Sequence, residues 1–307
     1  MIELFLNDGE ENILERMRFP AGETFFKVKP EVVHLPNYSI RRFTIKWMYE
    51  NDAEIFEVAN LLDYLFETFE ASIDVQCPYF PHARQDRYSG VGQPHSLKTM
   101  VKIFERFKDR TTFYVQDIHN NAASVIMDVD PECDFIVNVC SPKNPLQPDN
   151  YDFVICPDKG ALSRANLFAN KYRLKVIVCE KTRDPSTGKL SDPKVILYGQ
   201  SLEGKKLLVV DDVCDGGGTF EMLGKELKKF NPARLDLYVT HGIFSRDLEA
   251  MPSIDNFYAS YRMPGWRTLE VPEGKDFDVF CTPKGINTEK TVYPWGDGKW
   301  PNIERKN

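Results

Sequence analysis

Short runs of β-branched and aromatic residues alternate along this chain with stretches of helical periodicity, and this alternation constrains the fold more than any other feature. Several runs are apolar at every position, which is typical of central strands in a parallel sheet covered by helices. The pattern predicts strands over 72–77, 112–116, 151–156, 175–180, 206–212 and 234–241, and helices over 52–69, 94–107, 159–172 and 218–230. Strand–helix alternation indicates an α/β architecture with right-handed crossovers.

The chain is long enough for two domains. Its 307 residues are 42% hydrophobic, which suffices for two separate cores. A stretch rich in Pro and Asn at 141–150 is the best candidate boundary, so we expect domains over 1–140 and 141–307. From about residue 263 the chain is rich in Gly, Pro and Trp, and we expect an irregular tail there.

Charge and cysteine content limit the partners and the compartment. The 39 Lys and Arg against 46 Asp and Glu leave a net charge of −7, which argues against a nucleic-acid or membrane-surface binder. No run approaches the roughly 18 apolar residues of a spanning helix, and the N-terminus turns acidic where a signal peptide would be basic. The 7 cysteines are scattered without a C-x-x-C pair, so we expect reduced thiols in the cytoplasm.

The strand over 206–212 leads into the loop with the strongest chemical signal. It ends on adjacent carboxylates and is followed by an acid, three glycines and a threonine that open a helix: Asp211, Asp212, Asp215, Gly216, Gly217, Gly218 and Thr219. Glycine N–H groups and a helix N-terminus bind anions, and Thr219 can cap the helix and bind phosphate. Carboxylates accept hydrogen bonds from the hydroxyl groups of a sugar. The loop predicts a cradle for ribose 5-phosphate. The alternative is an ordinary strand–turn–helix connection.

A second polar loop spans residues 76–90. Arg84 and Arg87 offer planar donor groups to polyphosphate or a stacking surface to a base, Gln85 can read a purine edge, and Asp86 can orient an arginine. By composition alone, a solvated charged loop is the favoured interpretation.

A third loop follows the strand over 112–116. It carries Asp117 and His119, and a histidine in this setting can hold a divalent cation directly or through water. Taken alone, the pair also fits a capping aspartate beside a surface histidine.

Together these segments resemble the ribose-phosphate pyrophosphokinase family over roughly residues 19–245. The acid pair and glycines are similar to the phosphoribosyl pyrophosphate loop that type I phosphoribosyltransferases share with these kinases, with Gly216 where the family has Thr. Pro78-Tyr79-Phe80, followed shortly by Arg-Gln-Asp-Arg, resembles the ATP-binding segment of the pyrophosphokinases, which phosphoribosyltransferases lack.

The resemblance implies a complete nucleotide site. Phe19 and Glu23 lie in a segment that, in the family, reaches the adenine site of a neighbouring subunit, and Ala21 stands where the family has Asp. The implied ATP-binding residues are Phe19, Glu23, Arg84, Gln85, Asp86 and Arg87.

Further residues are implied for metal binding and catalysis. His119 would associate with the magnesium of Mg-ATP, and Asp158 would face the ribose and its metal. Lys181 and Arg183 correspond to the Lys-x-Arg of the family's flexible catalytic loop, which closes over the triphosphate and supplies positive charge. Mg²⁺ is the implied cofactor.

The resemblance also implies a fold, a reaction and an assembly. We expect two tandem type I phosphoribosyltransferase-like domains in a homodimer or hexamer whose active sites are shared between subunits. The reaction would transfer the diphosphate of ATP to the C1 hydroxyl of ribose 5-phosphate, giving 5-phosphoribosyl 1-pyrophosphate and AMP. The alternatives are a phosphoribosyltransferase that consumes phosphoribosyl pyrophosphate, a non-catalytic regulatory homologue, or a kinase with another phosphoryl donor.

Overall fold

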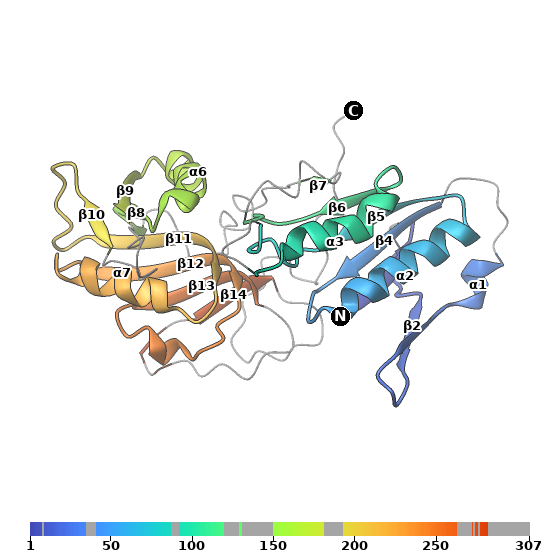
Figure 1. Cartoon of the computed structure of the whole chain (residues 1–307). Coiled ribbons are helices and arrows are strands. Elements are labelled where there is room, and N and C mark those ends of the chain that lie inside the picture. The colour runs from blue at the N-terminus through green and yellow to red at the C-terminus, as the bar shows by residue number, and fades with distance from the viewer. Residues whose placement is uncertain are drawn as a thin grey trace. The chain divides into compact units, whose positions relative to one another are not determined.

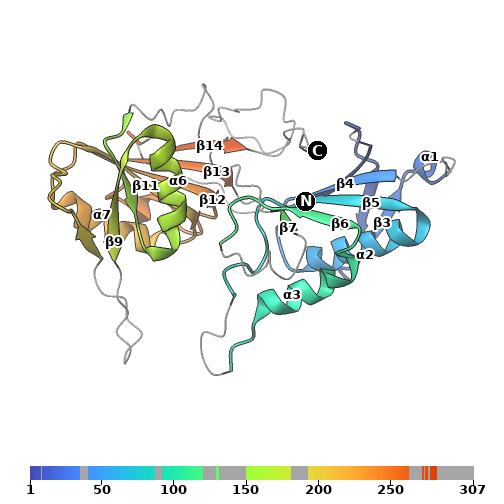
Figure 2. The same cartoon turned by 90° about the horizontal axis from the view of Figure 1, so that it is seen from above.

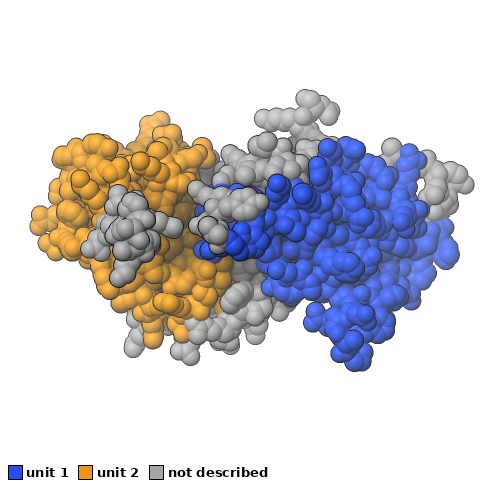
Figure 3. Space-filling view, in the orientation of Figure 1, with its two compact units in different colours: residues 1–133 blue, residues 134–307 orange. Residues whose placement is uncertain are grey.

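The structure is a computed structural model that describes residues 1–7, 9–34, 41–86, 92–119, 129–130, 150–180, 193–262, 272, 274–275 and 277–281. The chain folds into two compact units, Met1–Cys133 and Asp134–Asn307 (Figure 3). The expected boundary after residue 140 stays a prediction, because residues 131–149 lie outside the described part.

Unit 1 is built on a mainly parallel sheet. Its strand order is β1-β4-β5-β6-β7, in which only the edge strand β1 runs antiparallel to its neighbour. Helices α2 and α3 follow β4 and β5 and cover the same face of the sheet (Figures 1 and 2). The bounds are β1 Ile2–Leu6, β4 Arg41–Trp47, α2 Ala53–Thr68, β5 Ala71–Gln76, α3 Ser96–Phe104 with a 3₁₀ turn Glu105–Phe107, β6 Thr111–Tyr114 and β7 Val129–Asp130.

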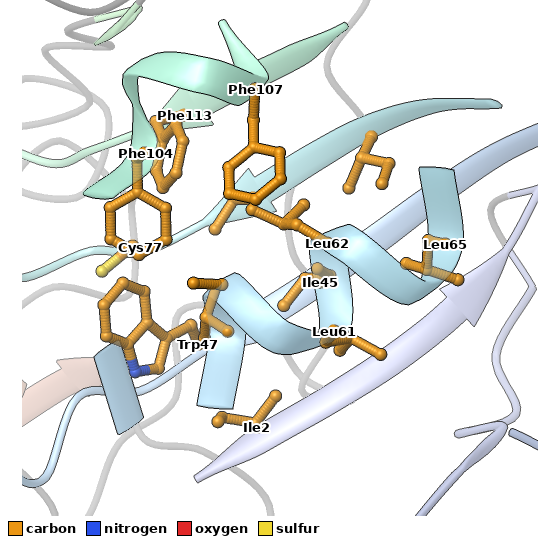
Figure 4. Packing of buried hydrophobic residues seen from close by; sticks show 14 of the residues in the cluster. Ile2, Ile45, Trp47, Leu61, Leu62, Leu65, Cys77, Phe104, Phe107 and Phe113 are labelled. Carbon is orange, nitrogen blue, oxygen red and sulfur yellow. The ribbon is translucent and has the colours of Figure 1, made fainter. Parts of the chain in front are cut away.

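The core of unit 1 lies between this sheet and its helices. Helix α2 buries an apolar stripe with helical spacing, which consists of Val58, Leu61, Leu62 and Leu65. The stripe packs toward strand residues and toward the aromatic rings of α3 and β6 (Figure 4). Burial of each large apolar side chain contributes roughly 1.5–3 kcal/mol, so this helix face accounts for the position of α2 on the sheet.

A β-hairpin projects from unit 1 (Figure 1). Strands β2 (Leu14–Arg18) and β3 (Thr24–Val28) pair antiparallel, and the short helix α1 (Pro30–Val33) follows them. Most hairpin side chains are exposed, and Leu14 and Val28 at its base belong to the unit 1 core.

Unit 2 contains a larger sheet with the order β10-β9-β8-β11-β12-β13-β14. All neighbours are parallel except the edge strand β10. The bounds are β8 Phe153–Cys156, a 3₁₀ turn Lys159–Ala161, α6 Leu162–Tyr172, β9 Lys175–Glu180, β10 Lys194–Ile196, β11 Lys206–Cys214, α7 Gly218–Lys228, β12 Arg234–Gly242, a 3₁₀ turn Leu248–Ala250, β13 Asn256–Arg262 and β14 Phe277–Cys281.

Helices α6 and α7 cover opposite faces of the unit 2 sheet (Figure 2). Alternate residues of β11 make this possible, because Leu208 and Val210 pack with α6 while Leu207 and Val209 pack with α7. The continuous apolar run of β11 is therefore explained by burial on both faces, as the sequence predicts.

The predicted strands and helices are present, with shifts of a few residues at their ends, and the α/β architecture is confirmed. The prediction of an irregular tail is wrong for Phe277–Cys281, which pair in parallel with β13 as β14. The aromatic and β-branched residues of this segment favour a strand despite the Gly- and Pro-rich surroundings. Among the described residues, no helix is long and apolar enough to cross a membrane.

Candidate functional site

Asp211 and Asp212 lie near the carboxyl end of β11, where open parallel sheets gather ligands. The strand continues to Cys214, two residues beyond its expected end, since Val213 and Cys214 pair with His241 and Gly242 of β12. The carboxylates therefore belong to a central strand and not to a loop, and the sheet fixes their backbone.

The carboxylate of Asp211 has an unfavourable electrostatic environment. Its Oδ1 accepts the N–H of Asp212 at 2.9 Å and lies 3.4 Å from the guanidinium of Arg164, a buried residue of α6. Burial, and then the neighbouring charge of Asp212, raise the pKa of Asp211 well above its ordinary value, although Arg164 acts in the opposite direction. A group that donates hydrogen bonds or carries positive charge would relieve this strain.

The glycine segment after β11 forms the turn that opens α7. Gly217 has φ +72° and is the N-cap of the helix, so a left-handed backbone conformation begins α7. The expectation that Thr219 caps the helix is wrong, because Thr219 lies one residue inside it. The first intrahelical bond runs from the N–H of Glu221 to Gly217, which leaves the preceding N–H groups of the first turn for an anion.

A second segment lies against this turn. Residues 243–246 follow β12, and the N–H groups of Ile243 and Phe244 donate to the carbonyl of Cys214 at 2.9 and 3.1 Å. The hydroxyl of Ser245 donates to Asp215 Oδ1 at 2.6 Å. Asp215 thus joins two loops at the carboxyl edge of the unit 2 sheet.

Asp158 lies at the end of the neighbouring strand β8. Its Oδ1 accepts the N–H groups of Gly160 at 2.9 Å and Ala161 at 3.3 Å, so it caps the turn that precedes α6. Burial raises the pKa of the Cys156 thiol to about 11, and the charges of Asp158 and Asp211 act in the same direction. These acids therefore share one neighbourhood with the thiol, which stays protonated and unreactive at neutral pH.

In unit 1, the loop after β5 has a buried half and an exposed half. Phe80 and Ala83 are buried in the core, and His82 Nε2 lies 2.9 Å from Asp52 Oδ1 at the start of α2. Arg84 and Gln85 follow directly and are exposed, while Asp86 is half-buried. The apolar residues of the segment thus anchor the loop, which presents its arginine and glutamine outward.

The loop with His119 lies beside it, because β5 and β6 are neighbouring parallel strands. The N–H of Gln116 donates to the carbonyl of Pro78 at 3.0 Å, which joins the two loops at their base. Asp117 has φ +44°, and His119 is exposed. The structure therefore gathers Arg84, Gln85, Asp86 and His119 at the carboxyl edge of the unit 1 sheet.

Phe19 and Glu23 are the two ends of the hairpin turn. The N–H of Phe19 donates to the carbonyl of Glu23 at 2.8 Å, and the Phe19 ring is 51% exposed. Met17 and Phe25 are also exposed large apolar side chains of this hairpin. The hairpin thus carries an apolar surface that unit 1 itself does not cover.

Three of the predicted site residues, Arg87, Lys181 and Arg183, lie outside the described residues. Within the described part, no group of three or more His, Cys, Asp or Glu side chains could hold a metal ion. The donor set still fits Mg²⁺, since this ion is bound through one or two carboxylates together with substrate phosphates and waters. Half-buried Asp211, whose pKa is raised, and buried Asp212 suit such a cation.

Comparisons with known proteins agree with this architecture. A phosphoribosyl transferase domain model matches residues 143–258, which include β8, β11, α7 and the glycine turn. The phosphoribosylpyrophosphate synthetase of Mycobacterium smegmatis is similar in structure, with a TM-score of 0.69 and 18% identity over 86% of this chain and 85% of that chain. At this identity the likeness shows the fold alone.

Curated relatives are similar in sequence over most of the chain. The ribose-phosphate pyrophosphokinase of Pyrococcus abyssi is 27% identical over 241 residues, which cover 76% of this chain and 77% of that protein. The enzyme of the same name from Thermococcus kodakarensis is 28% identical over 237 residues, which cover 76% and 78%. These relatives confirm the predicted resemblance to this family and the predicted enzyme class. The chain is similar in sequence and in fold to the ribose-phosphate pyrophosphokinases, as a divergent relative.

Proposed function

We propose that this chain transfers the β,γ-diphosphate of Mg-ATP to the C1 hydroxyl of ribose 5-phosphate. The hydroxyl oxygen attacks the β-phosphorus, and a new O–P bond forms. The bond between the β-phosphorus and the oxygen that bridges it to the α-phosphorus breaks, and AMP leaves with that oxygen. The hydroxyl proton is released, and the products are 5-phosphoribosyl 1-pyrophosphate and AMP.

One observation supports the proposed binding of ribose 5-phosphate. The carboxylates of Asp211 and Asp212 lie on the strand that leads directly into the glycine turn at the N-terminus of α7. Sugar hydroxyls would donate to the carboxylates and relieve the strain that raises the pKa of Asp211. The phosphate would accept from the N–H groups of Gly218 and Thr219 in the first turn of α7.

The loops of unit 1 support the ATP half. Exposed Arg84 and Gln85 and half-buried Asp86 sit on a loop anchored by Phe80 and Ala83. In the proposal, the Arg84 guanidinium binds the phosphates or stacks on the base, and Gln85 reads the adenine edge. His119, on the adjoining loop, would orient the metal-bound triphosphate.

Charge neutralisation completes the proposal. Bound Mg²⁺ would offset the negative charge of the substrate phosphates. Lys181 and Arg183, outside the described residues, are proposed to close over the triphosphate and stabilise the charge of the transferring diphosphate. Asp158 would face the ribose. Transfer of the diphosphate requires that bound ribose 5-phosphate and bound ATP lie in contact, and this contact stays a prediction.

The reaction is tested by its products. Purified protein incubated with ribose 5-phosphate, ATP and Mg²⁺ should form AMP, and omission of ribose 5-phosphate should abolish it. ADP as the product would indicate an ordinary kinase, and the absence of AMP would contradict the proposal. Release of pyrophosphate from phosphoribosyl pyrophosphate and a free base would instead identify a phosphoribosyltransferase.

Arg84→Gln should raise the KM for ATP about 10-fold and leave the KM for ribose 5-phosphate within about twofold, because one charge-assisted hydrogen bond is worth roughly 1.5–3 kcal/mol. Arg84 is exposed, so the Tm should stay within about 1 °C. Lys108→Gln removes an equal charge from an exposed site just before β6, at the opposite edge of the sheet, and is the matched control. Equal effects of both substitutions on the KM for ATP would refute a specific role for Arg84.

The proposal includes assembly and location. The exposed Phe19, Met17 and Phe25 side chains of the hairpin suit contact with a second subunit, as a homodimer or hexamer requires, and light scattering measures this mass. We also propose a cytoplasmic location, which is supported by four described cysteines that are buried and outside any disulfide: Cys77, Cys156, Cys179 and Cys214.

A further inference from the structure

The side chain of Arg246 covers the backbone of Gly216. A Cβ atom placed on Gly216 would meet Arg246 Nε at 3.5 Å, Arg246 Cδ at 3.6 Å and Ser245 Oγ at 3.6 Å. These are ordinary van der Waals distances, and they are the nearest atoms to that position. Arg246 therefore occupies the space into which a longer side chain at position 216 would extend.

The position of Arg246 is fixed by its own segment. Besides the two bonds from residues 243 and 244 to Cys214, the N–H of Ser245 donates to the carbonyl of Asp215 at 3.2 Å and its hydroxyl donates to the carboxylate at 2.6 Å. The residue before Arg246 is thus held against the residue before Gly216 by two hydrogen bonds. The guanidinium is consequently kept beside the turn that opens α7.

The charges around the turn leave Arg246 available for a ligand. Asp215, which precedes Gly216, accepts the Ser245 hydroxyl, and Arg164 lies against Asp211. Arg246 is exposed and forms no ion pair with the residues that the structure describes. An uncompensated guanidinium beside a helix N-terminus is a favourable place for a phosphate dianion.

We propose that Arg246 binds the 5-phosphate of ribose 5-phosphate, in the place left open by the absence of a side chain at Gly216. This inference rests on the proposed function and adds a residue to its ribose 5-phosphate site. A threonine at position 216 would offer one hydroxyl to the phosphate. The glycine found here admits a guanidinium instead, which offers two donors and a full positive charge.

The role of Arg246 is tested by comparing the KM for ribose 5-phosphate with the KM for ATP. Arg246→Ala should raise the KM for ribose 5-phosphate about 10-fold and leave the KM for ATP within about twofold, since only the sugar phosphate meets the guanidinium. Arg246→Lys should recover part of the loss, because it keeps the charge and loses the planar pair of donors. Arg173→Ala, at the far end of α6, removes an exposed arginine from the same unit and should change neither value.

A rescue separates phosphate binding from a structural role. In the Arg246→Ala background, Gly216→Thr has room for its side chain and should lower the KM for ribose 5-phosphate several-fold. If Arg246 had only a structural role, a threonine hydroxyl at position 216 could not take over that role. An unchanged KM in Arg246→Ala, or a raised KM that Gly216→Thr fails to lower, would overturn the inference. AMP formation by the native chain would leave the proposed function intact.

Direct binding keeps the test independent of turnover. Ribose 5-phosphate at millimolar concentration should raise the Tm of the native chain, ribose without the phosphate should raise it less, and Arg246→Ala should abolish this difference. An equal difference in both proteins would overturn the inference. If the native chain binds ribose 5-phosphate in this way but forms no AMP, the proposed reaction fails and the phosphate site stands.

Discussion

Asp211→Asn should lower kcat/KM for ribose 5-phosphate on the order of 100-fold and at the same time raise the Tm. The amide cannot accept the sugar hydroxyls as a charged group does, and loss of charge-assisted hydrogen bonds worth about 3 kcal/mol corresponds to this factor. The same substitution removes a half-buried charge that lies beside the charge of Asp212. We expect a stabilisation of about 1 kcal/mol, or roughly 2–4 °C in Tm.

The pH dependence of this stabilisation has a definite sign. Burial and the charge of Asp212 raise the pKa of Asp211 in the folded protein above its value in the unfolded chain. The folded state therefore holds a proton that the unfolded state has lost, and the free energy of unfolding falls as pH rises through this window. The Tm advantage of Asp211→Asn should be absent near pH 3 and should grow as the pH rises from about 4 through the raised pKa.

Asp152→Asn is the matched control for this titration. Asp152 accepts the backbone N–H of Lys206 at 2.9 Å, which, with the Lys205 side chain, lowers its pKa. It lies before β8, at the edge of the sheet away from Asp211, so its substitution should lower the Tm near neutral pH and leave AMP formation unchanged. A Tm increase in both variants would contradict the prediction that the charge of Asp211 is unfavourable in the folded protein. A Tm difference between Asp211→Asn and the native chain that does not change with pH would contradict it as well.

Strands were predictable where burial makes the sequence locally apolar. The bounds of β9 equal the expected range. The strand β12, whose side chains are buried on both faces, extends its expected range by one residue. The strand β2 was missed since four of its five residues are exposed. In β13, buried Ser260 interrupts the apolar run, and its partner is the hydroxyl of Tyr238 at 2.6 Å on the neighbouring strand.

The candidate site was predictable for the residues that one contiguous loop supplies. The acid pair and the glycines lie within a single strand–turn–helix connection, so local spacing indicates their chemistry. Arg164 is 47 residues from Asp211, and Ser245 is 30 residues from Asp215, and no local pattern relates them. Their positions depend on the order of strands in the sheet, which places β8 and β12 on either side of β11.

A large loss of stability should come from Gly217→Ala. Gly217 has φ +72°, and a Cβ atom there would overlap Met251 Sδ and lie 2.7 Å from Met251 Cγ. The left-handed conformation costs roughly 1–2 kcal/mol and displacement of a buried side chain costs roughly 1–3 kcal/mol more. We expect a loss of about 2–5 kcal/mol, or roughly 4–20 °C in Tm, and a fall in kcat/KM for ribose 5-phosphate on the order of 100-fold as the turn shifts.

Gly204→Ala separates the backbone strain from the collision. Gly204 also has positive φ, +68°, but a Cβ atom there would meet nothing within 4 Å. It precedes β11, at the edge of the sheet opposite the turn, so this variant should lose only about 1 kcal/mol and keep full activity. Equal Tm losses in Gly204→Ala and Gly217→Ala would show that contact with Met251 does not limit the turn.

A double substitution tests the contact itself. Met251 is 1% exposed, and Met251→Ala alone should cost about 2–5 kcal/mol through the cavity that it leaves. Combined with Gly217→Ala, it makes room for the added methyl group, so the two losses should sum to more than the loss of the double variant. If the losses were additive, the methyl group would be accommodated without displacement of Met251. In that case the fall in kcat/KM for ribose 5-phosphate would result from the changed backbone conformation at position 217 alone, because Met251 would not have moved.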